Sequence, residues 1–529
     1  MNLPETWLSV TIGEITDHVE KVQPANVPEK EICYLDISGI DNNTNRVREA
    51  KIYLGSEAPS RARQRVKEGD ILFSTVRTYL KNIARVPSKF DGEIASTGFS
   101  VLRPSQCILS DYLFAFTLTP MLLEPLAALQ RGSSYPAVRD QDVRLQVIPL
   151  PPLAEQKRIV AKIEELFSEL DAGEESLRQA RRQLGVYRQS LLKQAFEGRL
   201  TAPWRAQNPG LLESPEQLLA RIQEERKASC QQQTENWEEA VEEWENSGKK
   251  DKRPKKPIEP TFFPQMTTDI HGLIPTPDGW TVELVGNCPT DSLIGLVRSA
   301  AAQHEGPSGF PYIKMDRVDM LGNLDATPDV FVDCTEEEGG RFALQAGDIL
   351  FNTRNSVELV GKVGIVRCDP ELPTVYNNNL MRIRLPNSID PIFFGLQLCS
   401  QPFRQRMEKV KKATTSVAAI YAKDFWPLPI VVTSLPEQKE IVRLLDEQFE
   451  VIEQNEREID AALKRSEALR QSILRKAFTG QLVPQDPADE PASTLLARIR
   501  SEREAAAKLA NPKKKVAKKK AARKRGPKS

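Results

Sequence analysis

One phrase occurs twice in this chain, and the duplication constrains the fold more than any other feature. The sequence "LAEQKRIVAKIEELF" begins at residue 153, and "LPEQKEIVRLLDEQF" begins 282 residues later, at residue 435. At the same offset, "RQSLLKQAFEGRL" (188–200) returns as "RQSILRKAFTGQL" (470–482). A duplication on this scale decides the architecture before any local pattern does, because both copies are expected to fold in the same way.

Shorter matches extend the repeat over nearly the whole chain. "YLDISGID" (34–41) matches "YIKMDRVD" (312–319), and "EGDILFST" (68–75) matches "AGDILFNT" (346–353). Beyond the long phrase, "LLARIQEER" (218–226) is echoed by "LLARIRSER" (495–503). The protein is therefore two tandem copies of one unit, and each unit is a globular head followed by a long segment.

The long segment is predicted to be a helix in both copies. Proline stands at its start, and Gly198 or Gly480 stands where the first residue beyond a helix is expected. Ser434 and Glu437 have the spacing of a capping box. Each helix would run for roughly 44 residues, or roughly 65 Å. The apolar residues that recur at helical spacing are Ile159, Val160, Ile163, Leu166, Phe167, Leu170, Leu177, Leu184, Leu191, Leu192, Ala195 and Phe196, then Ile441, Val442, Leu445, Phe449, Ile452, Ile459, Ala462, Leu469, Ile473, Leu474 and Phe478.

Two such helices are expected to pack on each other. A helix of this length with one apolar stripe is unstable alone in water and must bury the stripe against a similar surface. A whole globular domain separates the two helices, which permits an antiparallel pair. The predicted fold class is therefore α/β (α+β) globular domains alternating with long α-helices, in two tandem repeats whose helices pair as an antiparallel coiled coil.

The repeat also predicts the order of domains. Each head mixes short strand-like runs with turn clusters, and Gly69-Asp70 and Gly347-Asp348 are turn pairs that open a buried strand. The expected segments are head 1 (1–149), the first spacer helix (150–200), a helical and charged linker (201–270), head 2 (271–430), the second spacer helix (431–482), a C-terminal helix (483–510) and a disordered basic tail (511–529).

Composition indicates a soluble protein whose cysteines are expected to be reduced thiols. The chain is 40% hydrophobic and 28% charged, and its seven cysteines form no C-x-x-C pair. No secretory signal or membrane-spanning run is evident, so we expect a cytoplasmic protein. From residue 512 onward the chain holds ten Lys or Arg and no acid, which leaves 63 basic against 73 acidic residues before it. Such a tail can bind phosphates non-specifically, or it can be a solvated terminus without a role.

The motifs of several enzyme classes are missing. No glycine-rich nucleotide-binding fingerprint occurs, and the three histidines, His18, His271 and His304, are too scattered for a zinc site. Glu155-Gln156-Lys157 and its counterpart at 437–439 fit the E-x-K half of a metal nuclease motif. Both glutamates lie in the first turn of a helix, where a negative charge interacts favourably with the helix dipole. Neither phrase has a Pro-Asp partner at the spacing of the nuclease motif. The sequence therefore favours a binding protein over a catalyst.

Two stretches diverge between the heads and are rich in residues that contact DNA. After "GDILF", head 1 reads "STVRTYLKN" and head 2 reads "NTRNSVELVGK"; later, "LQRGSSYPAVRD" stands opposite "VKKATTSVAAIYAKD". Arg, Lys, Ser, Thr, Asn and Tyr donate to phosphates and read base edges. Different loops on a shared scaffold suit two heads that read different sequences, although ordinary surface drift would also produce them. The candidate DNA-binding residues are Ser74, Thr75, Arg77, Tyr79, Lys81, Arg131, Ser133, Ser134 and Tyr135 in head 1, and Asn352, Arg354, Asn355, Lys411, Lys412, Thr414, Thr415 and Ser416 in head 2.

Together the paired helical phrases and the two "GDILF" strands resemble the specificity subunit of type I restriction-modification systems. The resemblance covers nearly the whole chain except the basic tail. It implies two target-recognition domains that read the halves of a split, asymmetric double-stranded DNA site. It also implies a helical spacer that sets the gap and docks two methyltransferase subunits, while restriction and motor subunits join through the complex.

The resemblance further implies a subunit without catalysis of its own. S-adenosylmethionine, ATP and magnesium would then serve the partner subunits, and no metal is expected in this chain. The apolar residues predicted for the spacer and its methyltransferase-docking surface are Leu166, Phe167, Leu191, Phe196, Phe449, Ile473 and Phe478. The alternative from another class of protein is a coiled-coil scaffold whose heads bind proteins.

Overall fold

The chain folds into two compact units. The computed structural model describes residues 3–132, 135–247, 253–257, 262–263, 276–306 and 308–502. The first unit joins the chain up to Arg178 with the chain from Ile459 onward, and the second runs from Gln179 to Glu458. Each unit is described by itself below.

Head 1 is built from two four-stranded sheets, the small hairpin β4 (Ile40–Asp41) with β5 (Arg46–Val47), and an antiparallel pair of terminal strands. The pair joins its first and last strands, since Leu8 lies opposite Leu150 and Thr11 opposite Val147. Short helices α1 (Ile12–Ile15), α2 (Ser110–Thr117), α3 (Pro120–Ala128) and α4 (Asp140–Arg144) complete the head. The strand pair is β1 (Leu8–Thr11) with β12 (Val147–Leu150), and the sheets are β2 (Thr16–Asp17), β11 (Phe99–Pro104), β8 (Ile71–Ser74) and β9 (Ile83–Arg85), and β6 (Lys51–Leu54), β3 (Glu31–Leu35), β10 (Ile94–Ser96) and β7 (Ala62–Arg65).

Head 2 repeats this plan and adds a small sheet. Its helices are α8 (Glu336–Phe342), α9 (Pro391–Cys399), α10 (Gln401–Val410) and α11 (Ala422–Phe425). Its strand pair is β13 (Thr281–Leu284) with β25 (Pro429–Val432). Its first four-stranded sheet has the order β14 (Asp291–Ile294), β22 (Leu380–Arg384), β18 (Ile349–Asn352) and β20 (Val363–Ile365), and its second has the order β15 (Gln303–His304), β17 (Phe331–Val332), β16 (Phe310–Ile313) and β21 (Val375–Tyr376). The added small sheet has the order β19 (Arg354–Asn355), β24 (Ala418–Ala419) and β23 (Lys412–Ala413).

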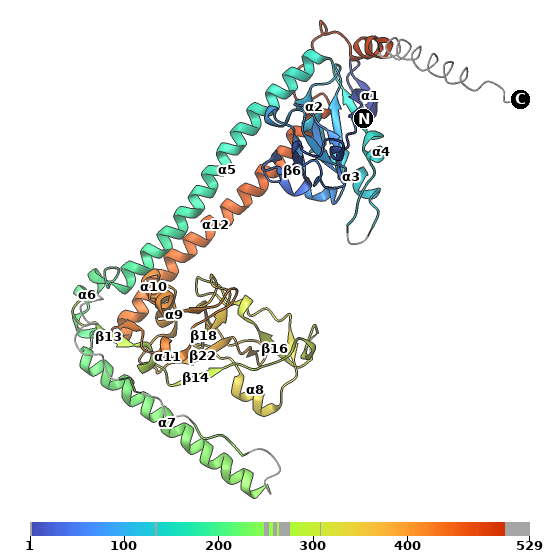
Figure 1. The fold of residues 1–529 in the computed structure, drawn as a ribbon. Helices are drawn as coiled ribbons and strands as arrows, with labels where there is room; N and C mark the ends of the chain where they lie inside the picture. The colour runs from blue at the N-terminus through green and yellow to red at the C-terminus, as the bar shows by residue number, and fades with distance from the viewer. Residues whose placement is uncertain are drawn as a thin grey trace, which may run out of the picture. The chain divides into compact units, whose positions relative to one another are not determined.

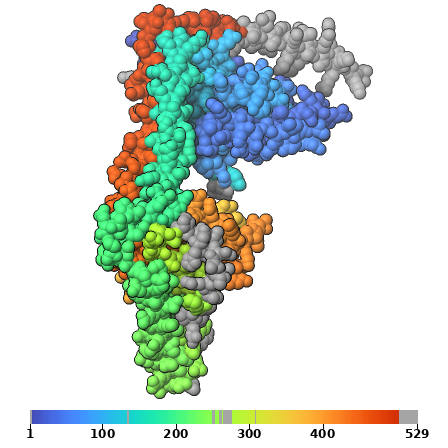
Figure 2. All heavy atoms as spheres, turned by 90° about the vertical axis from the view of Figure 1, so that its left-hand side faces the viewer, coloured from blue at the N-terminus to red at the C-terminus, as the bar shows by residue number. Residues whose placement is uncertain are grey.

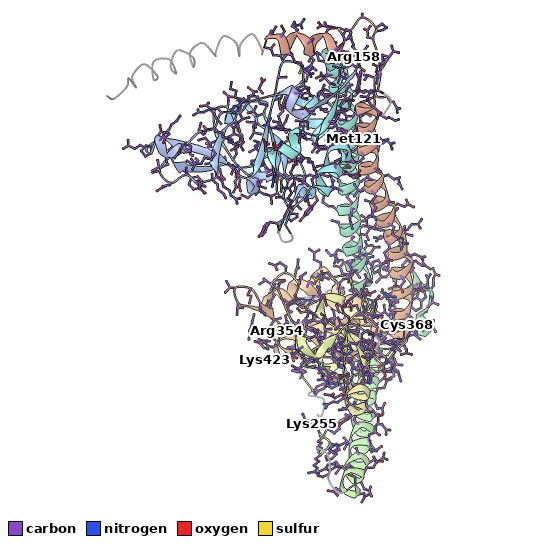
Figure 3. All side chains as sticks on the ribbon, turned by 90° about the vertical axis from the view of Figure 1, so that its right-hand side faces the viewer. Met121, Arg158, Lys255, Arg354, Cys368 and Lys423 are labelled. Carbon is purple, nitrogen blue, oxygen red and sulfur yellow. The ribbon has the colours of Figure 1, made fainter. Side chains whose placement is uncertain are left out.

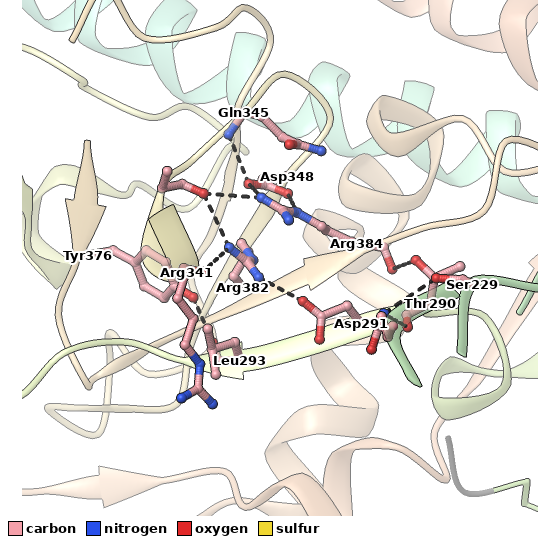
Figure 4. Close-up of polar contacts among 12 residues, drawn as sticks. Ser229, Thr290, Asp291, Leu293, Arg341, Gln345, Asp348, Tyr376, Arg382 and Arg384 are labelled. Atoms are coloured by element: carbon pink, nitrogen blue, oxygen red, sulfur yellow. Dashed lines mark hydrogen bonds and ion pairs between the residues drawn. The ribbon is translucent and has the colours of Figure 1, made fainter. Parts of the chain in front are cut away.

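The Gly-Asp pair before each central strand has a specific structural role. Gly69 and Gly347 adopt left-handed φ angles of 82° and 89°, which only glycine adopts without strain. The following aspartate is buried and forms an ion pair with an arginine of the neighbouring strand. In head 2, Asp348 accepts from Arg384 at 2.7 and 3.1 Å and from the backbone N–H of Gln345 at 2.9 Å (Figure 4). Asp70 and Arg103 form the equivalent pair in head 1, with a contact of 2.7 Å.

The two predicted long helices are present and pair antiparallel. Helix α5 (Leu153–Phe196) and helix α12 (Leu435–Phe478) each have 44 residues, and Figures 1 and 2 show them side by side. In the first unit, Ser466 donates to Glu174 at 2.7 Å. In the second unit, the Arg188 guanidinium lies 4.3 Å from the centre of the Phe449 ring. Residue numbers rise along one helix as they fall along the other, which confirms the antiparallel coiled coil.

A buried glutamate anchors the start of each long helix; we call the two clusters joint 1 and joint 2. In joint 1, Glu155 of α5 is 1% exposed and accepts from the Trp7 indole at 2.9 Å and from the Gln485 amide at 2.7 Å. Gly480, just beyond the end of α12, packs against Pro4, because a Cβ at Gly480 would lie 2.5 Å from a Pro4 ring carbon. Joint 1 therefore ties together the head's first segment, the start of α5 and the end of α12.

Joint 2 repeats this arrangement with the helices exchanged. Glu437 of α12 is fully buried and accepts from the Trp280 indole at 2.9 Å, from Thr201 at 2.7 Å and from Thr433 at 2.8 Å. It also forms an ion pair with Arg205 at 2.7 Å. In joint 1 the neutral amide of Gln485 donates to Glu155 instead. Gly198, beyond the end of α5, packs against Pro277 in the way that Gly480 packs against Pro4.

The predicted capping box at Ser434 is wrong. The Ser434 hydroxyl is buried and has no hydrogen-bond partner among the described residues, while the Glu437 side chain turns to joint 2. The neighbouring residue, Gln438, forms hydrogen bonds with backbone groups of the preceding loops instead. Gln438 accepts from the Asp390 N–H at 2.8 Å and donates to the Thr433 carbonyl at 2.7 Å. Pro436 is also inside the first turn, because α12 begins at Leu435.

The linker and the C-terminal segment fasten the heads through their repeated "LLARI" motifs. Helix α6 (Ala202–Gln207) is followed by α7 (Pro215–Asn246), the long helix at the bottom of Figure 1. In α7, buried Leu218 and Ile222 enter the core of the second unit. Residues 492–502 are also helical, and Leu495 and Ile499 enter the core of the first unit in the same way. The predicted basic tail, 511–529, lies outside the described residues.

The two joints are expected to respond differently to the same neutral substitution. Glu437→Gln should lower the free energy of unfolding by about 3 kcal/mol, because it leaves Arg205 without its buried anion. Glu155→Gln should change it by less than about 1 kcal/mol at pH 7, because the described residues place no cation within hydrogen-bonding distance of Glu155 and the amide keeps an acceptor for Trp7. Hydrogen exchange of the helix starts, measured on each full-length variant, reports both values.

The pH dependence gives a second readout of joint 1. Burial raises the pKa of Glu155, and the hydrogen bonds from Trp7 and Gln485 offset only part of this rise. A raised folded pKa means that the folded state binds the proton more tightly, so protection at joint 1 should fall as pH rises through that value. Glu155→Gln should remove this dependence, and Lys157→Gln, an exposed change in the same turn, should keep it. Equal losses in Glu155→Gln and Glu437→Gln would contradict the assignment.

Candidate nucleic-acid interface

The two divergent stretches of head 1 lie against each other at one end of β8. The Val138 N–H donates to the Thr75 carbonyl at 2.9 Å, and the Arg77 N–H donates to the Pro136 carbonyl at 2.7 Å. The Gln130 amide also contacts the Thr78 hydroxyl. Segments that are far apart in the sequence therefore form one continuous polar surface.

Aromatic and basic side chains are presented on this surface. Tyr79 is 59% exposed and Tyr135 is 69% exposed. The guanidinium of Arg77 lies 4.4 Å from the centre of the Tyr135 ring, a stacked arrangement that holds the cation in place. Arg77 and Lys81 both adopt left-handed φ angles, 48° and 52°, which are unusual for residues with side chains and are typical of functional sites. Arg131 is exposed as well.

In head 2 the two divergent stretches form the three-stranded sheet β19-β24-β23. Arg354 pairs with Ala419, and Ala419 pairs with Lys412 on its other side. Exposed Lys412 contacts Asp424 at 3.2 Å and lies 5.7 Å from the Tyr421 ring centre. The hairpin between β23 and β24 presents Thr414, Thr415 and Ser416, all of them exposed.

Four of the predicted DNA-binding residues are corrected by their burial. Ser74, Thr75 and Asn352 are 1%, 9% and 0% exposed. Their side chains make hydrogen bonds inside the head: Ser74 donates to the Val76 carbonyl, Thr75 to the Gly98 carbonyl and Asn352 to the Asn379 carbonyl. The Lys411 ammonium is bound by the Val357 carbonyl and Glu408, with its side chain 11% exposed. These four side chains are bound within the heads and shape the loops.

Three further predicted residues differ from the rest, and two exposed residues of the divergent stretch were not predicted. Asn355 is half-buried and donates to Asn352, while Ser133 and Ser134 lie outside the described residues. Tyr421, 47% exposed, and exposed Lys423 follow β24 directly. Figure 3 shows Lys423 and Arg354 on the side of head 2 that faces away from Cys368. Both residues lie in the second divergent stretch of head 2, so the divergence between the heads could have identified them from the sequence.

The apolar residues predicted to dock a methyltransferase are used within the chain. Phe478 packs against Tyr112 and Phe116, with ring centres 4.9 and 5.2 Å away. Phe196 packs against Phe393 at 5.4 Å. Leu191, Phe196, Phe449, Ile473 and Phe478 are all less than 8% exposed, and Leu166 and Phe167 are partly buried against the core of the first unit. These seven residues pack within the helix pair or between the helices and the heads, as predicted for the spacer, and their part in docking a methyltransferase stays a prediction.

The E-x-K phrases serve as structural anchors and not as a nuclease site. Both glutamates are buried and hydrogen-bonded in the joints, whereas Lys157 and Lys439 are exposed. Within the described ranges, no group of three or more His, Cys, Asp or Glu side chains is arranged to hold a metal ion. The same residues include no helix that is both long and apolar enough to cross a membrane.

Comparison with known proteins identifies the family. The family model for the type I restriction modification DNA specificity domain matches residues 4–179 and 298–465, well over half of the chain and part of both repeats. The chain belongs to this family. It is a specificity subunit of a type I restriction-modification system with two target-recognition domains, which favours this interpretation over the coiled-coil scaffold.

Individual relatives agree with this assignment. The type I restriction enzyme EcoKI specificity subunit of Escherichia coli is 27% identical over 414 residues, which cover 77% of this chain and 74% of the relative. The EcoDI specificity subunit of Escherichia coli is 28% identical over 43% of this chain and 50% of its own length. A solved structure described as "Structural basis underlying complex assembly and conformational transition of the type I R-M system" matches with a TM-score of 0.65 and 26% identity, covering 91% of this chain and 100% of that one.

Half-buried Arg77 and exposed Arg354 are expected to contribute to DNA affinity without changing the target. Arg77→Ala and Arg354→Ala should each weaken binding of duplex DNA roughly tenfold at moderate salt, and each should reduce the slope of log affinity against log salt by about 1 if the lost contact is to phosphate. The measurement is fluorescence anisotropy on the assembled complex. Lys67→Ala, an equal charge change at the opposite end of β8, is the control. An unchanged salt slope in both arginine variants would remove them from the interface.

Proposed function

We propose that each head reads one half of a split duplex site and that the long helices set the number of base pairs between the halves. The observation that carries this proposal is the pairing of a shared backbone with different loops. Both heads use the same sheet order around β8 and β18, and both bring two divergent polar stretches to the end of that strand. Two such heads in one chain can read two different sequences, which makes the complete site asymmetric.

The helical pair supports the role of a spacer. Helices α5 and α12 continue without interruption from one compact unit into the other, and they contact each other within both units. A paired helix resists bending better than a loop does, so the half-site spacing becomes a geometric property of the helices, as dimer spacing is for paired DNA-reading proteins. Joints 1 and 2 then transmit that geometry to the heads.

The remaining parts of the proposal concern partners. Two methyltransferase subunits would dock on this chain, and restriction and motor subunits would join through the complex. Methyl transfer from S-adenosylmethionine and the use of ATP and magnesium would take place in those subunits, so this chain would act without its own catalysis, in the cytoplasm. Support comes from family membership and from the described assembly of the related complex.

Replacing one head should change one half of the target. A chimera that carries residues 1–149 of a specificity subunit with a different target should keep the half-site of head 2 and the gap length. The measurement is a genome-wide map of methylated adenines after co-expression with the cognate methyltransferase. The reciprocal exchange of residues 271–430 is the matched control. A chimera in which both half-sites change would show that the heads do not read independently.

Lengthening both helices should widen the gap and leave the half-sites unchanged. Seven residues inserted after Arg178 and seven after Glu458, where the two units meet along the chain, add about 10.5 Å to the helical pair. At about 3.4 Å per base pair this corresponds to about three extra base pairs. A heptad insertion nearly preserves the face that each helix presents. Insertion in α5 alone is the control and should disrupt the pair. An unaltered gap in the double insertion would contradict the spacer role.

A further inference from the structure

The loops of head 1 are organised by one peptide carbonyl in the turn between β10 and β11. The Gly98 carbonyl accepts from both the backbone N–H and the hydroxyl of Thr75, each at 2.9 Å. The Thr75 carbonyl in turn accepts from the Val138 N–H at 2.9 Å. Three separate segments are thereby locked together at the end of β8.

Head 2 repeats these bonds residue for residue. The Asn379 carbonyl, in the turn between β21 and β22, accepts from the backbone N–H and the hydroxyl of Thr353 at 2.9 and 3.1 Å. The Thr353 carbonyl accepts from the Ile420 N–H at 3.0 Å. The same hydrogen bonds define which residues of the two heads are equivalent, although the turn itself was not among the divergent loops predicted from the sequence.

Around this shared framework the side chains differ at four equivalent positions. The backbone hydrogen bonds are the same in both heads while the side chains differ. This pattern is expected where two copies of one scaffold recognise different ligands. The equivalent residues of heads 1 and 2 are Val76 and Arg354, Thr97 and Asn378, Gly98 and Asn379, and Arg139 and Tyr421.

In head 2 these residues surround a pocket of about 220 Å³. Buried Met381 and Ile420 form part of its apolar lining, and Ile294, 46% exposed, adds to it. Asn378 is exposed at the same pocket, and Asn379 is half-buried, with its amide 3.5 Å from the Met315 sulfur, a weak acceptor that a base could replace. The cations Arg354 and Lys423 lie on this side of the head (Figure 3), where they can hold a phosphate backbone. The pocket thus combines amide groups, an apolar surface and positive charge.

We propose that the β21–β22 turn is a third base-reading element of head 2, in which Asn378 and Asn379 recognise an A·T base pair in the major groove. A carboxamide is the side chain that pairs with adenine through one donor and one acceptor, at N7 and N6. The apolar lining suits the thymine methyl group of the same pair. Head 1 has Thr97 and Gly98 at this turn, so it lacks both amides and reads its half-site differently. This inference rests on the proposed function, in which head 2 reads a half-site.

The test is the methylation specificity of Asn378→Ala and of Asn378→Ala combined with Asn379→Ala, in the complete complex. We expect the half-site of head 2 to become degenerate at one A·T position, with discrimination reduced roughly tenfold to hundredfold there. All other positions, the gap and the half-site of head 1 should remain. Asn387→Ala is the matched control, because Asn387 is an exposed asparagine of the same head away from the turn. Asn378 is exposed, so its removal leaves the core intact.

Three results would overturn the inference. They are an unchanged motif in both asparagine variants, an equal loss of affinity for every sequence, and relaxation at a G·C position. Thr97→Ala provides a symmetric check, since it should alter only the half-site of head 1 or nothing. A failure of this inference is distinguishable from a failure of the proposed function. In the first case exchanging residues 271–430 still replaces one half-site, and in the second case that exchange has no such effect.

Discussion

The buried glutamates at the starts of the two long helices are the contacts on which the rest of the structure depends. Each carboxylate accepts from a tryptophan indole that precedes the first strand of its own head, Trp7 in one case and Trp280 in the other. The glycine that ends the opposite helix packs against a proline of the same segment. One cluster therefore fixes the direction of a helix, the end of its partner and the orientation of a head. The aromatic packing of Phe478 and Phe196 against the heads adds apolar contacts beside these clusters.

The clusters also explain why the repeated phrase is retained so closely in the two copies. The glutamate satisfies the tryptophan, and the glutamine after it satisfies the loops that precede the helix; Gln156 and Gln438 make equivalent hydrogen bonds to different loops. A buried carboxylate is expensive to desolvate unless several donors surround it. Joint 2 supplies a cation, Arg205, whereas the hydrogen bonds of joint 1 come from neutral donors, and burial raises the pKa of Glu155. The two ends of a repeated architecture are therefore not energetically equal.

The sequence predicted the helices better than the heads. Proline at one end and glycine at the other bounded each helix, because these residues act through local backbone geometry, and the repeat confirmed the assignment. The strands of the heads are only two to six residues long and pair over large sequence separations, as β1 does with β12, so local patterns identified their class and not their order. The Gly-Asp turns were predicted correctly, but the arginines that pair with the aspartates come from a distant strand.

The candidate site shows the same division between local and distant information. Residue type placed Ser74, Thr75 and Asn352 among the DNA contacts, but each comes at the end of a buried strand and turns inward. An apolar stripe alone could not show whether Phe196 or Phe478 meets a head or a partner subunit. Comparison of the two heads within the folded chain was more informative, because it separates backbone positions that are kept from side chains that change.

The central claim is that two independently reading heads are held at one distance by a single pair of helices. The most direct test is to co-express the unaltered chain with its cognate methyltransferase and to map every methylated adenine in the genome. The account predicts a motif of two specified parts separated by a constant number of unspecified base pairs. A continuous motif, or two specified parts at variable separation, would contradict it.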